Sequence, residues 1–378
     1  MLVQFLILCF VYIYYNSLSA TYCNNSPIGR KKLLIFAGVL LVLQSSLRNF
    51  AVGADTYAYY EFFQDTTSRT WDELIYIFQH AYVDEYRKDP GYLIFEKAFS
   101  CVIPDFRCFL ILVISMFIHA LFRLIYRFKV PMKGILISVA LYLSLFYSFF
   151  SITGIRQTIA TAIALYCVPY ALDRKKIKFF LIIGIAATIH KSVLLFIPFY
   201  FFPLIKNNKL TILLAFATFA PMWIFGQTIG KTIIAGTIFD TYENFLEDNV
   251  DTNGALGFAV LILLTGFFCL KFIKVTEELD KWRPLLHSVA FALFYTPMTS
   301  IGPSQMRIIQ YYSIFLVILM PVLLKSLKIT WKSSMNIEMY AFVCFSIFAI
   351  TRSSSYGFFW EPMKLGINYS NNTVIQGW

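Results

Sequence analysis

The chain has 378 residues, of which 58% are hydrophobic and 14% are charged, and its mean hydropathy is +0.66. A soluble domain carries roughly 25% charged residues, so this composition excludes an ordinary soluble protein and indicates that lipid covers most of the apolar surface. The net charge of +11 comes from short basic clusters between apolar runs, which argues against a nucleic-acid partner.

Apolar runs bounded by charged or turn residues predict about twelve membrane helices, so the expected fold is an all-α polytopic transmembrane bundle. The runs lie near 2–15, 33–49, 107–126, 134–151, 157–172, 179–190, 192–205, 210–226, 255–273, 285–301, 308–324 and 337–351. The first run has no basic region before it and no small-residue cleavage site after it, so we interpret it as a membrane helix rather than a signal peptide. The pair 179–190 and 192–205 could instead be one interrupted segment.

Two loops, 48–106 and 227–254, are long, and we place them within a single domain of residues 1–378. In the first loop, Thr70 and Glu73 have the spacing of a capping box, and Asp89-Pro90 is typical of an N-cap followed by a first-turn proline. The apolar faces of the two predicted helices are Leu74, Phe78 and Tyr82, and Tyr92, Phe95, Phe99 and Val102. We expect these amphipathic helices to lie on the outer leaflet.

The charges of the loops alternate along the chain. When successive loops are assigned to alternate sides, one side holds most of the 32 basic residues and few of the 21 acidic ones. The positive-inside rule makes that side cytoplasmic, and both ends of the chain are then expected outside.

Four basic sites break this pattern because they lie at the outer ends of predicted helices. They are Arg48, Arg156, the pair His190-Lys191, and Arg307. An ionisable group near hydrocarbon is costly, so pairing or function is the default expectation. The ordinary alternative is that each side chain snorkels to the interface or pairs with a loop carboxylate. Taken together, they indicate a site for a polyanion at the outer leaflet, most naturally a diphosphate on a lipid.

A hydroxyl that attacks such a lipid diphosphate would need a base. Asp55, Glu61 and neutral His190 are the candidates, although Asp55 could equally be an ordinary helix N-cap. The sequence contains no Walker A, GxSxG, HExxH or Asp-x-Asp motif. We therefore expect no metal and no other cofactor.

Several motifs resemble those of a known family. Arg48 to Thr56, followed by Tyr60, is similar to the Arg…Gly-x-Asp…Tyr signature of the EpsG family of Wzy-like polysaccharide polymerases. Further segments match in the same order: Asp89-Pro90-Gly91-Tyr92, Gly154-Ile155-Arg156-Gln157-Thr158-Ile159-Ala160, Ile189-His190-Lys191-Ser192, and Arg307 with Tyr311 and Pro321. At position 89 the chain departs from the family, which usually has Glu there.

The resemblance implies a bacterial inner-membrane glycosyltransferase of the O-antigen or exopolysaccharide polymerase class, with its active site facing the periplasm. Such an enzyme transfers a growing glycan from undecaprenyl diphosphate onto a second lipid-linked repeat unit. Asp55, His190 and Arg156 are the expected catalytic residues. The expected diphosphate-binding residues are Arg48, Arg156, Gln157, Lys191, Arg307 and Tyr311. The implied partners are the lipid-linked donor and acceptor, the bilayer, and a chain-length regulator.

Two alternatives from other classes stay open. A flippase or transporter of lipid-linked oligosaccharides would line both halves of a pathway with cations and usually shows internal repeats, which we do not find. A membrane O-acyltransferase would use a histidine within a span. His119 and His287 are the candidates, although a hydrogen-bonded packing role is the simpler interpretation of each.

Overall fold

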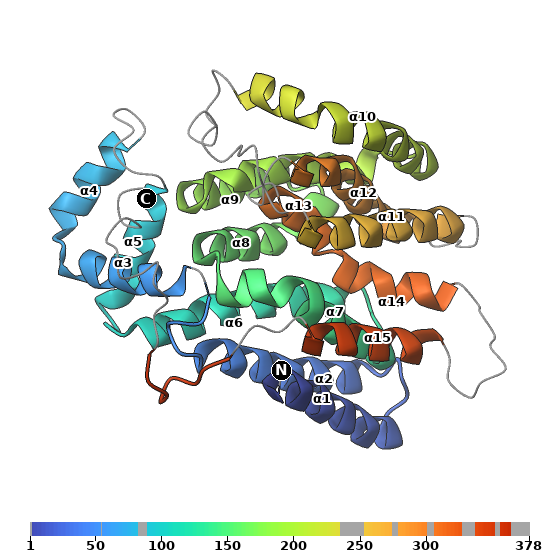
Figure 1. Cartoon of the computed structure of the whole chain (residues 1–378), viewed down its shortest axis with the longest axis horizontal. Helices are drawn as coiled ribbons and strands as arrows, with labels where there is room; N and C mark the ends of the chain where they lie inside the picture. The colour runs from blue at the N-terminus through green and yellow to red at the C-terminus, as the bar shows by residue number, and fades with distance from the viewer. Residues whose placement is uncertain are drawn as a thin grey trace. The chain divides into compact units, whose positions relative to one another are not determined.

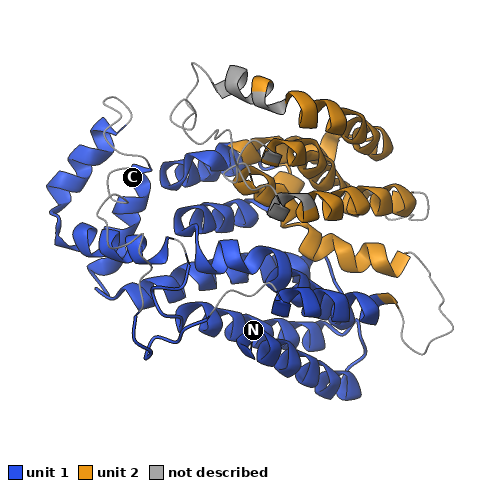
Figure 2. Cartoon of the chain, in the orientation of Figure 1, with its two compact units in different colours: residues 1–170, 175–194, 338–378 blue, residues 171–174, 195–337 orange. Residues whose placement is uncertain are grey.

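The computed structural model describes residues 2–53, 55–81, 89–234, 253–273, 279–300, 306–326, 337–351 and 356–363. These residues are mostly helical, and the one β-pairing among them is an isolated antiparallel bridge between Arg48 and Phe358. The all-α fold class is therefore confirmed for the described part of the chain. Contacts divide the chain into two compact units (Figure 2). Unit 1 comprises residues 1–170, 175–194 and 338–378, and unit 2 comprises residues 171–174 and 195–337.

Unit 1 holds all or nearly all of ten α-helices and two π-helical turns (Figure 1). They are α1 (Leu2–Thr21), α2 (Pro27–Ser46), α3 (Thr56–Ser68), α4 (Trp71–His80), α5 (Pro90–Ser100), α6 (Phe106–Arg127), α7 (Met132–Leu141), η1 (Tyr142–Phe146), η2 (Ser148–Ile152), α8 (Ile155–Leu172), α9 (Lys176–Ile189) and α15 (Ile337–Thr351). Helices α2 and α6 pack antiparallel. Arg107 at the start of α6 donates to the Ser46 carbonyl at 2.7 Å, and Arg30 near the start of α2 donates to the Tyr126 carbonyl at 3.4 Å.

The short helices of the first long loop form where the sequence predicts them. Thr70 and Glu73 make the reciprocal capping box that starts α4. The predicted apolar face of α4 is partly wrong, because Leu74 and Ile77 are buried whereas Phe78 is 37% exposed. Spacings of three and four residues both keep side chains on one helix face, and here α5 covers the Leu74–Ile77 side. Tyr82 lies outside the described residues.

In α5, Tyr92 is buried, and Phe95 and Phe99 pack against the same apolar cluster. The prediction that Val102 shares this face is wrong, because Val102 is 79% exposed. The reason is that α5 ends at Ser100, so the helical periodicity no longer applies at position 102.

Unit 2 contains most of the 3-10 helix η3 (Lys191–Leu204) and the elements that follow it. They are α10 (Asn208–Ile234), α11 (Asn253–Ile273), α12 (Leu279–Tyr295), the 3-10 turn η5 (Thr296–Ser300), α13 (Met306–Ser313) and α14 (Leu316–Ser326). The predicted loop 227–254 begins too early, because α10 continues through residues 227–234. No proline follows Pro221 in that stretch, so nothing in the sequence interrupts the helix. Residues 235–252 lie outside the described part.

Three helical stretches among the described residues are long and apolar enough to cross a membrane. They are Leu2–Thr21, Phe106–Arg127 and Asn208–Phe225, and the pair α13–α14, bent by 55°, adds a fourth if it counts as one span. The apolar helices and the composition identify a membrane protein. The predicted count of about twelve spans is not confirmed, because several other apolar helices are shorter, including Met132–Phe146 and Ile337–Thr351.

The uncertain segment 179–205 forms two elements. Helix α9 ends at Ile189, His190 is extended with φ −158° and ψ 109°, and η3 begins at Lys191. His190 therefore occupies the break between two helices, where its side chain is not constrained to point along a helix face.

Candidate active site

The candidate site lies at one end of unit 1, where α2 and α9 finish and α6 and α8 begin (Figure 1). Hydrogen bonds join these ends. The guanidinium of Arg107, at the start of α6, donates to the carbonyl of Arg48 at 3.0 Å. Arg48 in turn donates to the carbonyl of Ile152, three residues before α8 begins, at 3.0 Å.

Asp89, at the start of α5, gathers the polar groups of the site. Its Oδ2 accepts from Arg156 Nη1 at 3.2 Å and lies 3.1 Å from His190 Nδ1. Its Oδ1 accepts from the backbone N–H of Lys191 at 3.2 Å. Both Asp89 and His190 are buried. The Asp89 carboxylate thus contacts two segments that lie 67 and 101 residues further along the sequence.

The local backbone explains how this carboxylate reaches the site. Asp89 is the N-cap of α5, but it adopts the left-handed conformation, with φ 58° and ψ 56°, and its side chain does not cap the helix. Gly91 then allows α5 to approach α9 closely, since a Cβ at this position would lie 2.2 Å from Thr188 Oγ1. The left-handed turn and the close approach together direct the carboxylate toward His190.

The charges around Asp89 determine its protonation. Burial alone would raise the pKa of the Asp89 carboxyl, but the hydrogen bond and charge of His190, the charge of Arg156 and the Lys191 N–H together hold this pKa below its usual value. Asp89 is therefore ionised at neutral pH. Arg156 carries the positive charge that pairs with this carboxylate.

Arg156 is positioned by aromatic residues as well as by Asp89. Its Nε donates to the Tyr59 hydroxyl at 3.4 Å, and its guanidinium carbon lies 5.9 Å from the centre of the Tyr59 ring. Tyr59 packs edge-on against Tyr92, within an apolar cluster to which α3, α5, α6, α8 and α9 contribute. Arginine on an aromatic face has a defined orientation, so this packing orders the charged cluster.

Arg48 has a different environment from Arg156. It is 1% exposed, and its guanidinium donates to the carbonyls of Ile152 and Ser45. Ile152 ends the π-helical turn η2, where terminal carbonyls lack helical partners and favour a cation. These contacts favour a structural role for Arg48, as the cap of η2, over contact with a diphosphate.

The remaining predicted residues of unit 1 lie near the cluster in sequence but not all at its centre. Asp55 is the N-cap residue of α3 and is half-buried, yet its side chain makes no capping hydrogen bond. Gln157 follows Arg156 in α8 and is buried. Lys191 is half-buried and contributes its backbone N–H to Asp89. The structure thus brings Arg156, His190 and Lys191 together.

Arg307 and Tyr311 belong to unit 2, one turn apart on α13. Arg307 is half-buried and Tyr311 is buried. Their expected contact with a diphosphate remains a prediction.

The two other histidines considered from the sequence make ordinary hydrogen bonds. His119 Nδ1 lies 2.5 Å from the Tyr166 hydroxyl, and His287 Nε2 lies 3.0 Å from the Ile205 carbonyl. His287 is buried, whereas His119 is exposed. These contacts agree with a hydrogen-bonding role for each.

A second carboxyl group of α5 is fully buried behind the cluster. Glu96 has no exposed surface, and its Oε2 accepts from Thr66 Oγ1 at 3.2 Å. Burial raises the pKa of Glu96 to about 8, so the group is neutral at pH 7. One short helix therefore presents an ionised carboxylate at its start and a neutral carboxylic acid in its middle.

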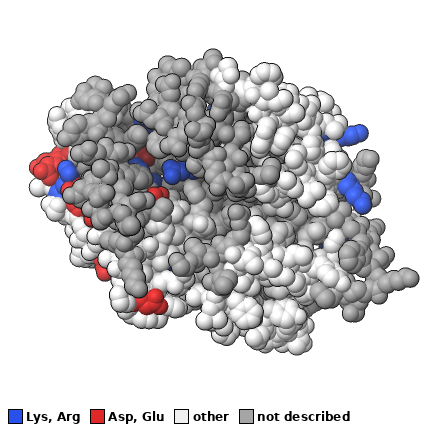
Figure 3. Space-filling view, viewed as in Figure 1, with Lys and Arg blue, Asp and Glu red and all other residues white. Residues whose placement is uncertain are grey.

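Acidic side chains gather on the outer surface of this part of unit 1. On the face seen in Figure 3, most of them lie over the region of α3, α4 and α5. Among the described residues, no group of three His, Cys, Asp or Glu side chains could hold a metal ion.

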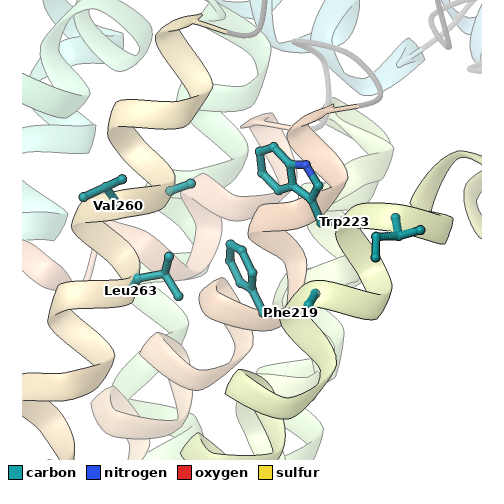
Figure 4. Close-up of a pocket in the computed structure, with 7 residues that line it drawn as sticks. Phe219, Trp223, Val260 and Leu263 are labelled. Atoms are coloured by element: carbon teal, nitrogen blue, oxygen red, sulfur yellow. The ribbon is translucent and has the colours of Figure 1, made fainter.

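Unit 2 has an apolar groove of about 380 Å³ between α10 and α11. Figure 4 shows Phe219 and Trp223 of α10 facing Val260 and Leu263 of α11. The other lining residues are Ala220, Ile224 and Ala259, so the groove contains no group that could transfer a proton or bind a phosphate.

Asp89 is the central residue that the sequence analysis did not place in the site. The sequence did contain a signal, because Asp89-Pro90-Gly91-Tyr92 was among the matching motifs. The helix-capping interpretation accounted for the aspartate without assigning it a chemical role, and its contacts with Arg156 and His190 depend on tertiary packing.

Comparisons with curated proteins and with solved structures find no match. A comparison with protein-family models finds one that matches residues 31–365, which is nearly the whole chain and includes every element of the site. The chain belongs to the EpsG family.

Proposed function

We propose that this protein is a polysaccharide polymerase that joins undecaprenyl-diphosphate-linked oligosaccharide repeat units on the periplasmic side of the inner membrane. Membership in the EpsG family supports a polymerase-type function in polysaccharide synthesis in general. The observation that carries the finer proposal is the cluster of Asp89, Arg156 and His190 at one end of unit 1.

His190 is the proposed general base. An ionised Asp89 at 3.1 Å favours the proton on Nδ1, which makes Nε2 the proton acceptor. The acceptor sugar hydroxyl would give its proton to Nε2 as its oxygen attacks the anomeric carbon of the donor. Asp89 stabilises the imidazolium that forms, and in this scheme it replaces Asp55 as the principal carboxylate.

Arg156 and Lys191 are the proposed groups that stabilise the departing diphosphate. The bond from the anomeric carbon to the diphosphate oxygen breaks as the new glycosidic bond forms, so negative charge increases on the leaving group. Arginine binds phosphate oxygens in a bidentate manner, and lysine adds a compact positive charge. Arg307 and Tyr311 of unit 2 are retained as proposed contributors.

The test is the polysaccharide ladder made by cells that carry Arg156→Ala in place of the wild-type protein. We expect the variant to insert normally and to leave single repeat units on their lipid carrier, because the leaving group is no longer stabilised. Arg307→Ala should give the same result. The matched control is Arg69→Ala, which removes a partly exposed arginine that directly follows α3 and pairs with Asp65 of that helix. A normal ladder from Arg156→Ala at normal protein abundance would refute the proposal.

A further inference from the structure

The described C-terminal segment, residues 356–363, is attached to unit 1 beside the end of α2 (Figure 1). The backbone N–H of Asn49 donates to the Gly357 carbonyl at 2.7 Å, and the Phe359 N–H donates to the Leu47 carbonyl at 3.0 Å. The Asn49 side chain donates to the Glu361 carbonyl at 2.8 Å. These bonds on both sides of Asn49 fix the position of the segment.

This fixed segment presents aromatic rings to its surroundings. Trp360 is 62% exposed and Phe359 is 46% exposed. The Trp360 ring lies parallel to that of Phe358, with centres 4.4 Å apart and 7° between the planes. Such a nearly parallel pair leaves a broad flat surface, and we refer to Phe358, Phe359 and Trp360 as the aromatic edge.

Polar groups border the aromatic edge. The Glu361 side chain is exposed directly after Trp360. The guanidinium of Arg107 lies between two rings, 4.7 Å from the centres of both Phe359 and Phe50. A pyranose ring has an apolar C–H face and a rim of hydroxyl groups, so it fits a flat ring bordered by a carboxylate and a guanidinium. A lipid chain offers no hydrogen-bonding partner for these polar groups.

The aromatic edge lies at the same end of unit 1 as the candidate site. Phe50, which covers Arg107, packs on the Tyr60 ring of α3 at 5.0 Å. The preceding residue, Tyr59, accepts the hydrogen bond from Arg156. The exposed rings are therefore linked through Arg107, Phe50 and the neighbouring residues Tyr60 and Tyr59 of α3 to Arg156.

We propose that the aromatic edge binds pyranose rings of the lipid-linked glycan, away from the diphosphate that Arg156 and Lys191 hold. This proposal rests on the proposed polymerase function and identifies a separate contact for the sugar part of the substrate. Stacking depends on the flat ring face and tolerates different sugars, so it suits a glycan whose units follow one another along a chain. The edge would keep the glycan near the site between successive transfers.

The binding test uses the protein in phospholipid nanodiscs and, as the probe, oligosaccharide repeat units released by mild acid from the cell's own lipid-linked pool. Saturation-transfer NMR reports which sugar C–H protons contact the protein. Trp360→Leu keeps an apolar side chain without the flat ring and should weaken binding roughly tenfold. Trp360→Phe should restore most of the binding. Trp71→Ala, at an exposed tryptophan of α4, is the matched control and should bind normally.

The polysaccharide ladders of the same variants distinguish a failure of the sugar-binding proposal from a failure of the polymerase function on which it rests. We expect Trp360→Leu to shorten the polysaccharide ladder without abolishing it, whereas Arg156→Ala abolishes it. Equal binding by Trp360→Leu and the wild type overturns the aromatic edge while leaving the polymerase intact. Brominated lipids quench the fluorescence of tryptophans that lie in the bilayer. If the wild type shows such quenching and Trp360→Phe does not, the Trp360 ring lies in the bilayer and the proposed sugar contact is also overturned. A normal ladder from Arg156→Ala would refute the polymerase itself.

Discussion

At the scale of single residues, the site depends on one carboxylate and the groups that it aligns. Asp89 contacts Arg156 and His190 with the same oxygen atom, Oδ2. The negative charge in this position orients His190 and Arg156 together. Arg48, in contrast, is occupied by the carbonyls at the end of η2.

Asp89→Asn is the sharpest test of this arrangement. The amide keeps the shape of the side chain but removes the charge that stabilises an imidazolium, so we expect polymer formation to fall roughly 10²-fold to 10⁴-fold. The measurement is the initial rate of polymer formation in isolated membranes. Asp105→Asn is the control, because Asp105 caps α6 through the Cys108 N–H at 2.8 Å. Asparagine caps a helix about as well as aspartate, so this variant should lose only about 0.5 kcal/mol of stability with the lost charge and should leave the rate unchanged. Similar rates for the two variants would contradict the role of Asp89.

Glu96 leads to a prediction about stability and pH. The pKa of Glu96 is raised to about 8 in the folded protein. Between the ordinary pKa of glutamate and this value, Glu96 is therefore protonated in the folded protein but ionised in the unfolded chain. Stability should therefore fall as the pH rises from about 5 to about 8, and it should be independent of this group above that range.

Glu96→Gln removes this dependence because the amide does not titrate. We would measure melting temperatures in detergent from about pH 5 to about pH 8. The melting temperature of the variant should rise relative to that of the wild type as the pH increases. Glu61→Gln, at an exposed position of α3, is the control and should keep the wild-type slope. Parallel curves for Glu96→Gln and the wild type would show that Glu96 is not a buried neutral acid.

At the scale of elements, irregular helices form the site. The π-helical turns η1 and η2 precede Arg156, and the last two carbonyls of η2 accept from Arg48 and from Ser45. The 3-10 helix η3 follows His190 and contains Pro198 and Pro203. Fourteen residues of 3-10 helix extend about 28 Å, compared with about 21 Å for an α-helix of the same number of residues. This length is close to the thickness of the hydrocarbon core.

The contact between α5 and α9 gives a prediction at this scale. Gly91→Ala would place a methyl group 2.2 Å from Thr188 Oγ1 and 2.9 Å from the Thr188 carbonyl carbon, so α5 must move away from α9. We expect the Asp89–His190 pairing to be lost, with activity falling at least tenfold and stability falling by roughly 1–3 kcal/mol. The measurements are the polymer ladder and the melting temperature. Gly184→Ala in α9 is the matched control, since a Cβ there meets nothing within 4 Å. An active Gly91→Ala protein would mean that this close approach does not position Asp89.

At the scale of the whole molecule, the charge distribution of unit 1 leads to a prediction about its orientation in the membrane. Its candidate site lies at the end of the helices that carries the acidic loop 48–106. The opposite end contains Arg30, Arg127 and Lys129, and the backbone N–H of Met132 there donates to the Asn24 carbonyl at 2.9 Å. The positive-inside rule predicts that this basic end is cytoplasmic.

Two natural cysteines can test this orientation without any added residue. Cys23 lies in the turn between α1 and α2, Cys101 directly follows α5, and both are free and exposed. A membrane-impermeant maleimide applied to spheroplasts should label Cys101 and leave Cys23 unlabelled until the membrane is opened. Cys101→Ser should reduce the labelling in sealed spheroplasts to what the half-buried Cys108 contributes. The reverse pattern would place the candidate site on the cytoplasmic side.

The sequence by itself determined the helical class, the membrane character and the capping box of α4, because these depend on composition, periodicity and contacts within a few residues. It also indicated Arg48, Arg156, the pair His190-Lys191 and Arg307 as one group, because a charged residue at the outer end of an apolar helix is costly unless it is paired or functional. Only the tertiary structure decided that Asp89 joins them and that Arg48 caps η2. Both outcomes depend on which helix ends lie next to each other. Local sequence patterns do not encode these contacts, because they arise from tertiary packing such as that of Gly91 on Thr188.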